Sequence, residues 1–232
     1  MSAQQLDGPL ESGSSFPARL TARVVTPGER PLVHGYDVEG DLARHYQPSD
    51  LLFLLLMGEL PPAPASRAFS VALMFLSPVS VAHASTHAAV VGRLCGAPAS
   101  STFGVAAIGA AEHARALLDD HAELFPWLRA PRGSLPERFR ARDASDLAAV
   151  QRLELALEPT GLAVPALAER PSRDAALLMV LFAVGFKRRE RLEAAIMLAR
   201  LPSGIAEALA ERPTNFGNYP INLPRFAYTE SP

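Results

Sequence analysis

The stretch HASTHAA at residues 83–89 decides how this chain is interpreted, together with the run of small residues that follows it. That run includes GVAAIGAA at residues 104–111 and leads to His113. A helix built from it has almost no large polar side chain on any face. Such a helix is buried on all sides, in a core or in a subunit interface. We therefore expect a central helix over residues 100–124 and a homodimer held by residues 100–117, with burial inside a monomer as the alternative.

The chain on either side of this stretch is patterned as helices with a small β element. Short apolar strands at residues 24–25 and 32–33 flank a Pro-Gly turn, which is typical of a β-hairpin. Ser49 is a favourable N-cap, Gly58 is a favourable helix end, and Pro202 favours a new helix start. The helices expected besides the central one span residues 50–57, 65–76, 81–94, 145–157, 174–186, 189–200 and 202–210. The fold class is thus predicted to be all-α with a short N-terminal β-hairpin.

Length, charge and cysteine content restrict the classes of function. The 232 residues suffice for one domain with a sizeable core, which we place at residues 19–232 after a disordered leader at residues 1–18. A small subdomain is expected around residues 125–200. A net charge of −2 argues against a nucleic-acid partner, because phosphate binding needs a basic excess. The single cysteine, Cys95, lies in an apolar run and is expected to be buried, and it suits a cytoplasmic protein without disulfides. The longest apolar run, residues 175–186, is too short to span a membrane.

Three segments give the chain a family resemblance. They are HASTHAA with the helix that follows it, GYDV at residues 35–38 and GELP at residues 58–61. Together they resemble the citrate synthase superfamily over residues 22–229, and the compact length is similar to that of small citryl-CoA lyases and the lyase module of ATP-citrate lyase. The resemblance implies a citrate-synthase-like helical fold and a lyase or synthase acting on a carbon–carbon bond beside a coenzyme A thioester. Coenzyme A is then part of the substrate, and no separate cofactor or metal is implied.

The resemblance also implies roles for three residues. His113 matches the histidine that donates a hydrogen bond to the thioester oxygen as it becomes an enolate. Asp174, at the start of a late apolar helix, matches the base that removes a proton from the carbon beside the thioester. Arg200 matches an arginine that grips a substrate carboxylate. The residues themselves leave simpler alternatives open, because an aspartate also stabilises a helix start and an arginine a helix end.

Two further groups contain candidate substrate-binding residues. His83 and His87 are four residues apart, the spacing of a two-histidine metal site. No third ligand accompanies them, so a packed or substrate-facing pair is preferred over zinc, with His83 as the substrate-binding member. Five arginines at positions 129, 132, 138, 140 and 142 surround a loop rich in proline and glycine. Because a guanidinium suits phosphate geometry, we expect Arg140 to bind the coenzyme A ester; solvation of the loop is the alternative.

Several positions depart from the superfamily pattern. Pro136 stands where the synthases carry a second histidine, and proline offers no side-chain donor. Ser80 stands where they carry a histidine that binds the keto acid, and Leu223 replaces the first arginine of an Arg-Pro-Arg segment. Loss of one general acid costs about 100- to 10,000-fold in rate. We therefore expect ordinary citrate synthesis to be absent or very weak. The alternative function is a non-catalytic paralogue that binds a CoA ester or pairs with an active homologous subunit.

Overall fold

The computed structural model describes residues 21–214, and the structural statements below concern these residues. The chain forms two compact units, Met1–Tyr46 and Gln47–Pro232. The predicted leader and Leu223 lie outside the described residues. Within the described range, no helix has the length and apolar character needed to cross a membrane.

The first unit carries the predicted β element, extended by one strand. Strands β1 (Val25–Thr26), β2 (Leu32–Val33) and β3 (Tyr36–Asp37) pair antiparallel in the order β1-β2-β3. His34 and Gly35 join β2 to β3, and their φ angles of 49° and 87° give the two-residue turn with positive φ at both positions. The N-terminal hairpin is therefore confirmed, and the GYDV segment supplies its third strand.

A short helical segment follows this sheet. The carboxylate of Asp37 accepts hydrogen bonds from the backbone N–H groups of Glu39 (3.0 Å) and Gly40 (2.7 Å), and this starts a π-helical turn at Val38–Leu42. A Cβ at Gly40 would lie 2.7 Å from a carboxylate oxygen of Asp37, so a side chain at this position would displace the capping carboxylate. Helix α1 (Ala43–His45) completes the unit.

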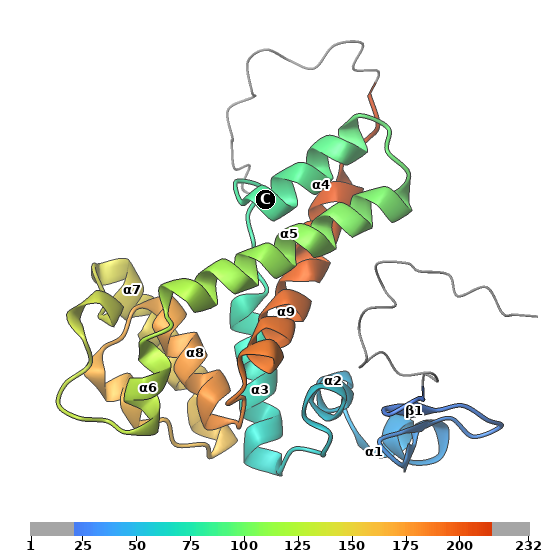
Figure 1. Ribbon diagram of the computed structural model, residues 1–232. Helices are drawn as coiled ribbons and strands as arrows, with labels where there is room; N and C mark the ends of the chain where they lie inside the picture. Colours follow the sequence, from blue (N-terminus) through green and yellow to red (C-terminus); the bar gives the residue numbers. More distant parts are fainter. Residues whose placement is uncertain (1–20, 215–232) are drawn as a thin grey trace, which may run out of the picture. The chain divides into compact units, whose positions relative to one another are not determined.

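The second unit is built from helices. They are α2 (Pro48–Met57), α3 (Ala63–Leu76), α4 (Ala84–Leu94), α5 (Ala99–Asp120), α6 (Leu124–Arg129), α7 (Ala144–Leu157), α8 (Arg173–Ala183) and α9 (Arg189–Ala210). Short 3-10 turns occupy Glu137–Phe139, Glu158–Thr160 and Pro165–Glu169. The two longest helices, α5 and α9, pack against each other, and α4 packs against both (Figure 1). The all-α prediction is confirmed.

The start of α2 differs from the prediction. The helix begins at Pro48, and Gln47 rather than Ser49 is its N-cap residue. The backbone N–H of Gln47 donates to the carboxylate of Asp50 at 2.9 Å. Asp50 thereby stabilises the helix start from within the first turn, and Pro48 is accommodated because the first helical position needs no N–H. The predicted end at Gly58 is confirmed by its left-handed φ of 85°.

The two long helices also differ from the prediction. The central helix ends at Asp120, and α6 is separate from it. Pro202 lies inside α9 and does not split it. A proline removes one N–H donor from a helix, but α9 packs against both α4 and α5, which holds it continuous. One helix of 22 residues therefore links Arg189 to Arg200 and beyond.

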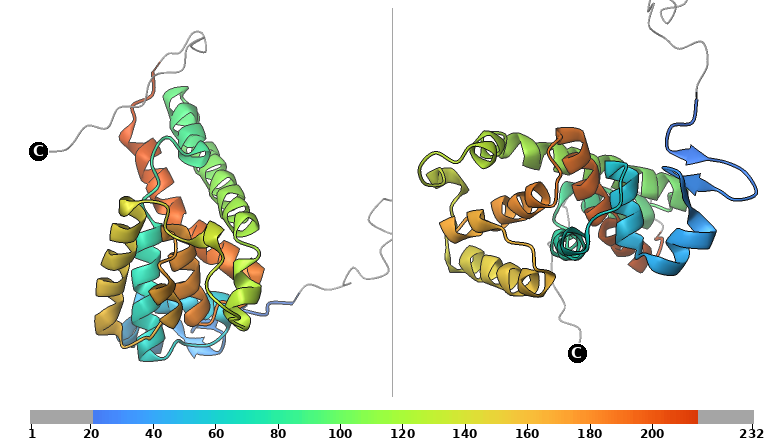
Figure 2. Two further views of the ribbon diagram at one scale, coloured as in Figure 1. Left: turned by 90° about the vertical axis from the view of Figure 1, so that its left-hand side faces the viewer. Right: turned by 90° about the horizontal axis from the view of Figure 1, so that it is seen from below.

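The main core surrounds α3. This helix contacts α2, α7, α8 and α9, and it is seen end-on among them in the right-hand view of Figure 2. Phe53, Phe69 and Phe186 meet there with ring centroids between 5.1 and 5.4 Å apart. Residues 175–181 of α8 are all buried, because this helix is apolar on every face. The core thereby fixes the start of α8 and the middle of α9.

Small residues let α4, α5 and α9 approach one another closely. A Cβ on Gly109 of α5 would lie 2.5 Å from the Cα of Ser85 on α4, so only glycine fits at this crossing. A Cβ on Gly204 of α9 would lie 3.5 Å from the hydroxyl oxygen of Thr86. This group of three helices has its own small core of Ala89, Val90, Ala106 and Ala208. The small residues of HASTHAA thus bring α4 onto both long helices.

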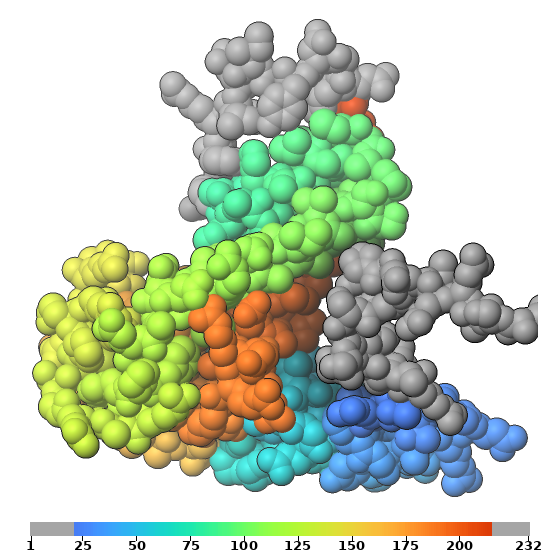
Figure 3. Space-filling view, in the orientation of Figure 1, coloured from blue at the N-terminus to red at the C-terminus, as the bar shows by residue number. Residues whose placement is uncertain are grey.

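The central helix α5 was expected to be buried on all sides, but it is buried only on the faces that pack against neighbouring helices. On α5, Val105 is 40% exposed and Ile108 is 69% exposed. Figure 3 shows α5 running in green across the surface of the second unit. The prediction that Cys95 is buried is wrong, because the residue ends α4 and is exposed.

Candidate functional site

One cavity of the second unit collects four of the five predicted site residues. Its volume is about 680 Å³, and His83, His113, Asp174 and Arg200 all line it. These residues belong to four elements: the N-cap of α4, the body of α5, the first turn of α8 and the middle of α9. The close packing of α4, α5 and α9 therefore places residues from distant parts of the sequence around one space.

Two histidines are stacked in this cavity. The imidazole rings of His83 and His113 have centroids 4.6 Å apart and an interplanar angle of 26°. Burial, the charge of Arg200 and the neighbouring His83 lower the pKa of His113 to about 4, while Asp174 acts in the opposite direction. His113 is therefore a neutral imidazole at pH 7, which carries one N–H donor.

Arg200 carries a buried guanidinium with few partners among residues 21–214. It is 9% exposed, and its Nε and Nη1 atoms are buried without a hydrogen-bond partner among the described residues. Burial lowers the pKa of Arg200, while the nearby Asp174 raises it. Burying a charge without partners is unfavourable. A bound carboxylate offers the two acceptors that a guanidinium needs, so this group is suited to an anionic ligand.

Asp174 is free for chemistry because another residue caps its helix. The N-cap of α8 is Ser172, whose hydroxyl oxygen accepts from the N–H of Ala175 at 3.4 Å. Within residues 21–214 the carboxylate of Asp174 has no hydrogen-bond partner. Its charge acts on both His113 and Arg200. The alternative of a side-chain cap therefore applies to Ser172, although Asp174 still favours the helix dipole.

His121 is a cavity residue that the sequence reasoning missed. It follows His113 by eight positions, and Leu117 between them also lines the cavity. Residues four and eight apart lie on one helix face, and this spacing is the signal that was available. The Nδ1 of His121 lies 2.9 Å from the carbonyl oxygen of Leu117. Since a carbonyl only accepts, Nδ1 carries a hydrogen and donates it to Leu117.

Three further guanidinium groups line the cavity, from Arg138, Arg142 and Arg173. Arg138 pairs with Glu123 at 2.6 Å, and Arg173 donates to the carbonyl of Phe75 at 3.1 Å. Together with the buried guanidinium described above, they give the cavity a basic side. Guanidinium groups suit both carboxylates and phosphates, and the carboxylates of Asp120, Asp146 and Asp174 line the same cavity, so its wall carries charges of both signs.

Asp146 connects the loop that carries Arg142 to the start of α8. Its carboxylate accepts from the backbone N–H groups of Arg142 (3.2 Å) and Arg173 (3.4 Å). Asp146 lies in the first turn of α7, and its own N–H donates to Asp143 at 2.9 Å. The acid is therefore engaged in structural hydrogen bonds, in contrast to Asp174.

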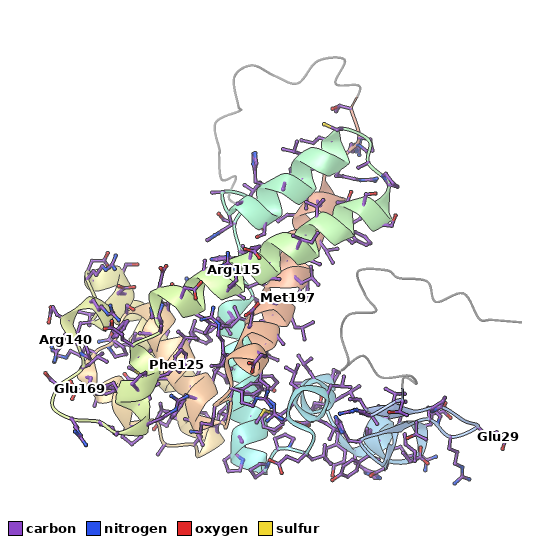
Figure 4. The ribbon with its side chains drawn as sticks, viewed as in Figure 1. Glu29, Arg115, Phe125, Arg140, Glu169 and Met197 are labelled. Atoms are coloured by element: carbon purple, nitrogen blue, oxygen red, sulfur yellow. The ribbon has the colours of Figure 1, made fainter. Side chains whose placement is uncertain are left out.

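Arg140 is the predicted site residue that the structure does not bring to the cavity. Its Nε donates to the carbonyl of Leu135 at 3.1 Å, and its Nη2 contacts Glu169 at 3.5 Å. Arg140 and Glu169 lie next to each other in Figure 4. The guanidinium is held inside its own loop, so Arg138 and Arg142 take the cavity positions that were expected of Arg140.

His83 is the N-cap of α4, and His87 lies one turn further along the helix. Among the described residues, no group of three histidine, cysteine, aspartate or glutamate side chains is placed to hold a metal ion. The ring of His83 packs on His113 instead. The interpretation of His83 as a packed and cavity-facing residue fits this geometry.

Comparison with known proteins gives matches in structure and none in sequence. No protein-family model matches the chain, and no curated protein sequence does. Citryl-CoA lyase from Hydrogenobacter thermophilus superposes with a TM-score of 0.61 at 17% identity, over 90% of this chain and 97% of that chain. A mutant ATP citrate lyase from Methanosaeta concilii, in complex with (3S)-citryl-CoA, gives a TM-score of 0.64 at 14% identity. ATP citrate lyase from Methanothrix soehngenii, in complex with citrate and coenzyme A, gives 0.53 at 14% identity.

The matches differ in how much of the other chain they cover. Both ATP citrate lyase matches cover 93% of this chain, which spans 44% of each of those chains. The citryl-CoA lyase is matched over nearly its full length. The chain therefore has the citrate-synthase-like fold that citryl-CoA lyase and ATP citrate lyase share.

Proposed function

We propose that this protein acts on a coenzyme A thioester of a carboxylic acid and breaks or forms the carbon–carbon bond beside the thioester, as a citryl-CoA lyase does. The observation that carries this proposal is the unpaired buried guanidinium of Arg200 in the same cavity as His113 and Asp174. An anion receptor, a neutral imidazole and a free carboxylate are the three groups that enolate chemistry on a carboxylated thioester requires.

Each of these groups has a role in the proposed reaction. In the direction of synthesis, Asp174 takes a proton from the carbon beside the thioester, and the electron pair moves onto the thioester oxygen. The N–H of His113 donates to that oxygen and stabilises the enolate. The enolate carbon then attacks the carbonyl carbon of a ketone whose carboxylate is held by Arg200. The electron pair of the ketone double bond moves onto its oxygen, which takes a proton from solvent to give the hydroxyl. In the direction of cleavage the hydroxyl loses its proton to solvent, the carbon–carbon bond breaks to give the ketone and the same enolate, and Asp174 returns a proton to the enolate carbon.

The stacked His83 supports the role of His113. A second imidazole against its ring disfavours the protonated form of His113, so the donor stays neutral while negative charge develops on the substrate. The arrangement resembles other active sites in which a neutral histidine polarises a carbonyl.

A non-catalytic paralogue that binds a CoA ester is the second candidate. Two positions favour it: Pro136, where the synthases carry a histidine, and Leu223, where they carry the first arginine of an Arg-Pro-Arg segment. Ser80 also stands where they carry a histidine. Neither Ser80 nor Pro136 lines the cavity, and the hydroxyl oxygen of Ser80 accepts a local hydrogen bond from the N–H of Ala82 at 3.1 Å. Their side chains do not supply the missing donors. A protein of this kind binds the ester without turnover, alone or beside an active homologous subunit.

The assembly proposed for this function is a homodimer through α5. The exposed apolar side chains Val105 and Ile108 lie in the half of α5 that is rich in alanine and glycine. Apolar surface of this kind is removed from water when two copies pack together, and small residues permit close helix contacts. A homologous partner subunit presents the same kind of surface and is the alternative occupant.

Citryl-CoA cleavage tests the proposed function. The protein is incubated with citryl-CoA, and acetyl-CoA and oxaloacetate are followed by liquid chromatography, while ester binding is measured by calorimetry. We expect cleavage by the natural chain and its loss in Arg200→Gln, with Arg152→Gln on the exposed face of α7 as the matched charge control. Binding without cleavage favours the non-catalytic candidate, and absence of both contradicts the proposal.

A further inference from the structure

A second cavity lies among the end of α5, α6 and the start of α9. Its volume is about 220 Å³, and it shares no lining residue with the larger cavity. Three basic side chains line it, from Arg129, Lys187 and Arg189, and no acidic side chain does. Its apolar wall is made by Leu118, Phe125 and Leu192. Phe125 is labelled on α6 in Figure 4.

Two of these three cations have no acidic partner among the described residues. Arg189 is neutralised by Asp119 at 2.7 Å. Arg129 donates to the backbone carbonyl of Lys187 at 3.4 Å, and the Nζ of Lys187 lies 3.5 Å from the centroid of the Phe182 ring. Burial, followed by the charge of Arg129, lowers the pKa of Lys187 below its usual value. Arg129 and Lys187 are both exposed, and neither is neutralised by an acidic side chain among residues 21–214. Two cations that remain available to an anion therefore lie beside an apolar wall.

The start of α9 adds to this positive potential. The N-cap Arg188 offers no side-chain acceptor to the free N–H groups of the first turn. Basic side chains at a helix N-terminus oppose the helix dipole. Glu190 pairs with Arg188 at 3.4 Å on the surface, so it does not neutralise the cations that line the cavity.

We propose that this cavity binds a small phosphate monoester with an apolar or aromatic body. A phosphate monoester carries a charge of about −1.5 to −2 at pH 7, which matches the two uncompensated cations, Arg129 and Lys187. A carboxylate supplies only half of that charge. The guanidinium of Arg129 suits the phosphate oxygens, and Phe125 with its two leucine neighbours covers the body of the ligand.

Phenyl phosphate is a direct probe of this site, because it joins a phosphate monoester to an aromatic ring. The single tryptophan of the chain, Trp127, stands between the cavity residues Pro126 and Arg129 in the sequence. Its fluorescence therefore reports binding at α6. We expect a saturable change in Trp127 fluorescence on titration of the natural chain with phenyl phosphate, and a weaker response to benzoate.

Charge variants assign the binding to this cavity. In Arg129→Gln/Lys187→Gln we expect the affinity for phenyl phosphate to fall about tenfold or more, since charge-assisted hydrogen bonds are lost. Lys187→Gln alone is the second variant if the double one does not fold, and a smaller loss in the same direction is expected. Arg152→Gln controls for net charge, and Arg200→Gln removes an anion-binding group of the larger cavity. Both are expected to bind phenyl phosphate as the natural chain does.

Four outcomes overturn the proposal. They are the absence of saturable binding by the natural chain, an unchanged affinity in the folded double variant, loss of binding in Arg200→Gln, and benzoate binding as tight as that of phenyl phosphate. The first two remove the site, the third moves the anion to the larger cavity, and the fourth removes the phosphate assignment. The test does not depend on citryl-CoA cleavage, so it stands apart from the function proposed above.

Discussion

The imidazole ring of His83 stacks on that of His113 at a centroid distance of 4.6 Å. This pairing depends on how closely α4 approaches α5, because His83 is the N-cap of α4 and His113 lies one turn after Gly109 on α5. The Cα of Ser85 occupies the place that a side chain at Gly109 would need. One glycine therefore sets the spacing of the two histidines that face the cavity.

The stability of the protein should depend on His113 between about pH 4 and pH 6.5. The folded-state pKa is lowered from 6.5 to about 4, so within this window the unfolded chain binds more protons than the folded chain. The free energy of unfolding then rises with pH across the window and is lost as the pH falls through it. Urea unfolding at several pH values should show this slope in the natural chain and a flatter one in His113→Asn. Parallel curves for the two proteins would contradict the lowered pKa.

Replacing the buried charge of Arg200 should stabilise the protein and abolish its binding of carboxylated esters. In Arg200→Met, we expect the free energy of unfolding to rise by roughly 1–3 kcal/mol, because unsatisfied buried polar atoms are removed. The matched control Arg152→Met, on the exposed face of α7, should stay within about 0.5 kcal/mol of the natural chain. Chemical denaturation and calorimetric titration with citryl-CoA measure the two effects. A less stable Arg200→Met would show that the guanidinium has partners in the folded protein.

Gly109 and Gly104 of α5 should respond in opposite ways to the same substitution. Gly109→Ala places a methyl group 2.5 Å from a backbone atom of α4, and overpacking of this kind costs about 1–3 kcal/mol. Gly104→Ala meets nothing within 4 Å and should gain up to about 1 kcal/mol from helix propensity. Thermal unfolding of the two variants checks the contrast. Equal stability would mean that α4 and α5 do not cross at Gly109.

The natural chain should sediment as a dimer, and Ile108→Glu should sediment as a monomer. The substitution places a charge in the apolar surface that we assign to the dimer interface. Leu155→Glu is the control, because Leu155 on α7 is 67% exposed and Ile108 is 69% exposed. Sedimentation velocity at micromolar concentration distinguishes the species. A natural chain that is monomeric under these conditions, or an Ile108→Glu variant that stays dimeric, contradicts the α5 interface.

Local signals account for most of the fold that the sequence predicted. Gly58 ends a helix because glycine, which has no side chain, readily adopts a left-handed φ. The run of small residues before His113 forms the long helix α5 as expected. Pro202 misled the prediction because its local cost is opposed by the packing of α9 on two neighbouring helices. Ser49 misled it because Asp50 supplies the acceptor at the helix start.

The residues that line the cavity could be predicted only where they matched the pattern of a known family. His113, Asp174 and Arg200 were assigned by their matches to a family, and periodicity alone would have added His121. The position of Arg173 in the cavity could not be predicted from the sequence, because it depends on how α8 packs against the end of α3. Arg140 was chosen in place of its neighbours because an irregular loop has no period from which the direction of a side chain follows.

Hydrogen exchange at the methyl group of acetyl-CoA tests the central claim, because it requires only a base and a donor to the enolate. We expect the natural chain to exchange these protons with deuterium oxide, as followed by mass spectrometry. Asp174→Asn should lose the exchange by about 100-fold or more, while its affinity for acetyl-CoA stays within a few-fold and its melting temperature is nearly unchanged. Exchange that persists in Asp174→Asn, or a natural chain that binds acetyl-CoA without exchange, would contradict the account.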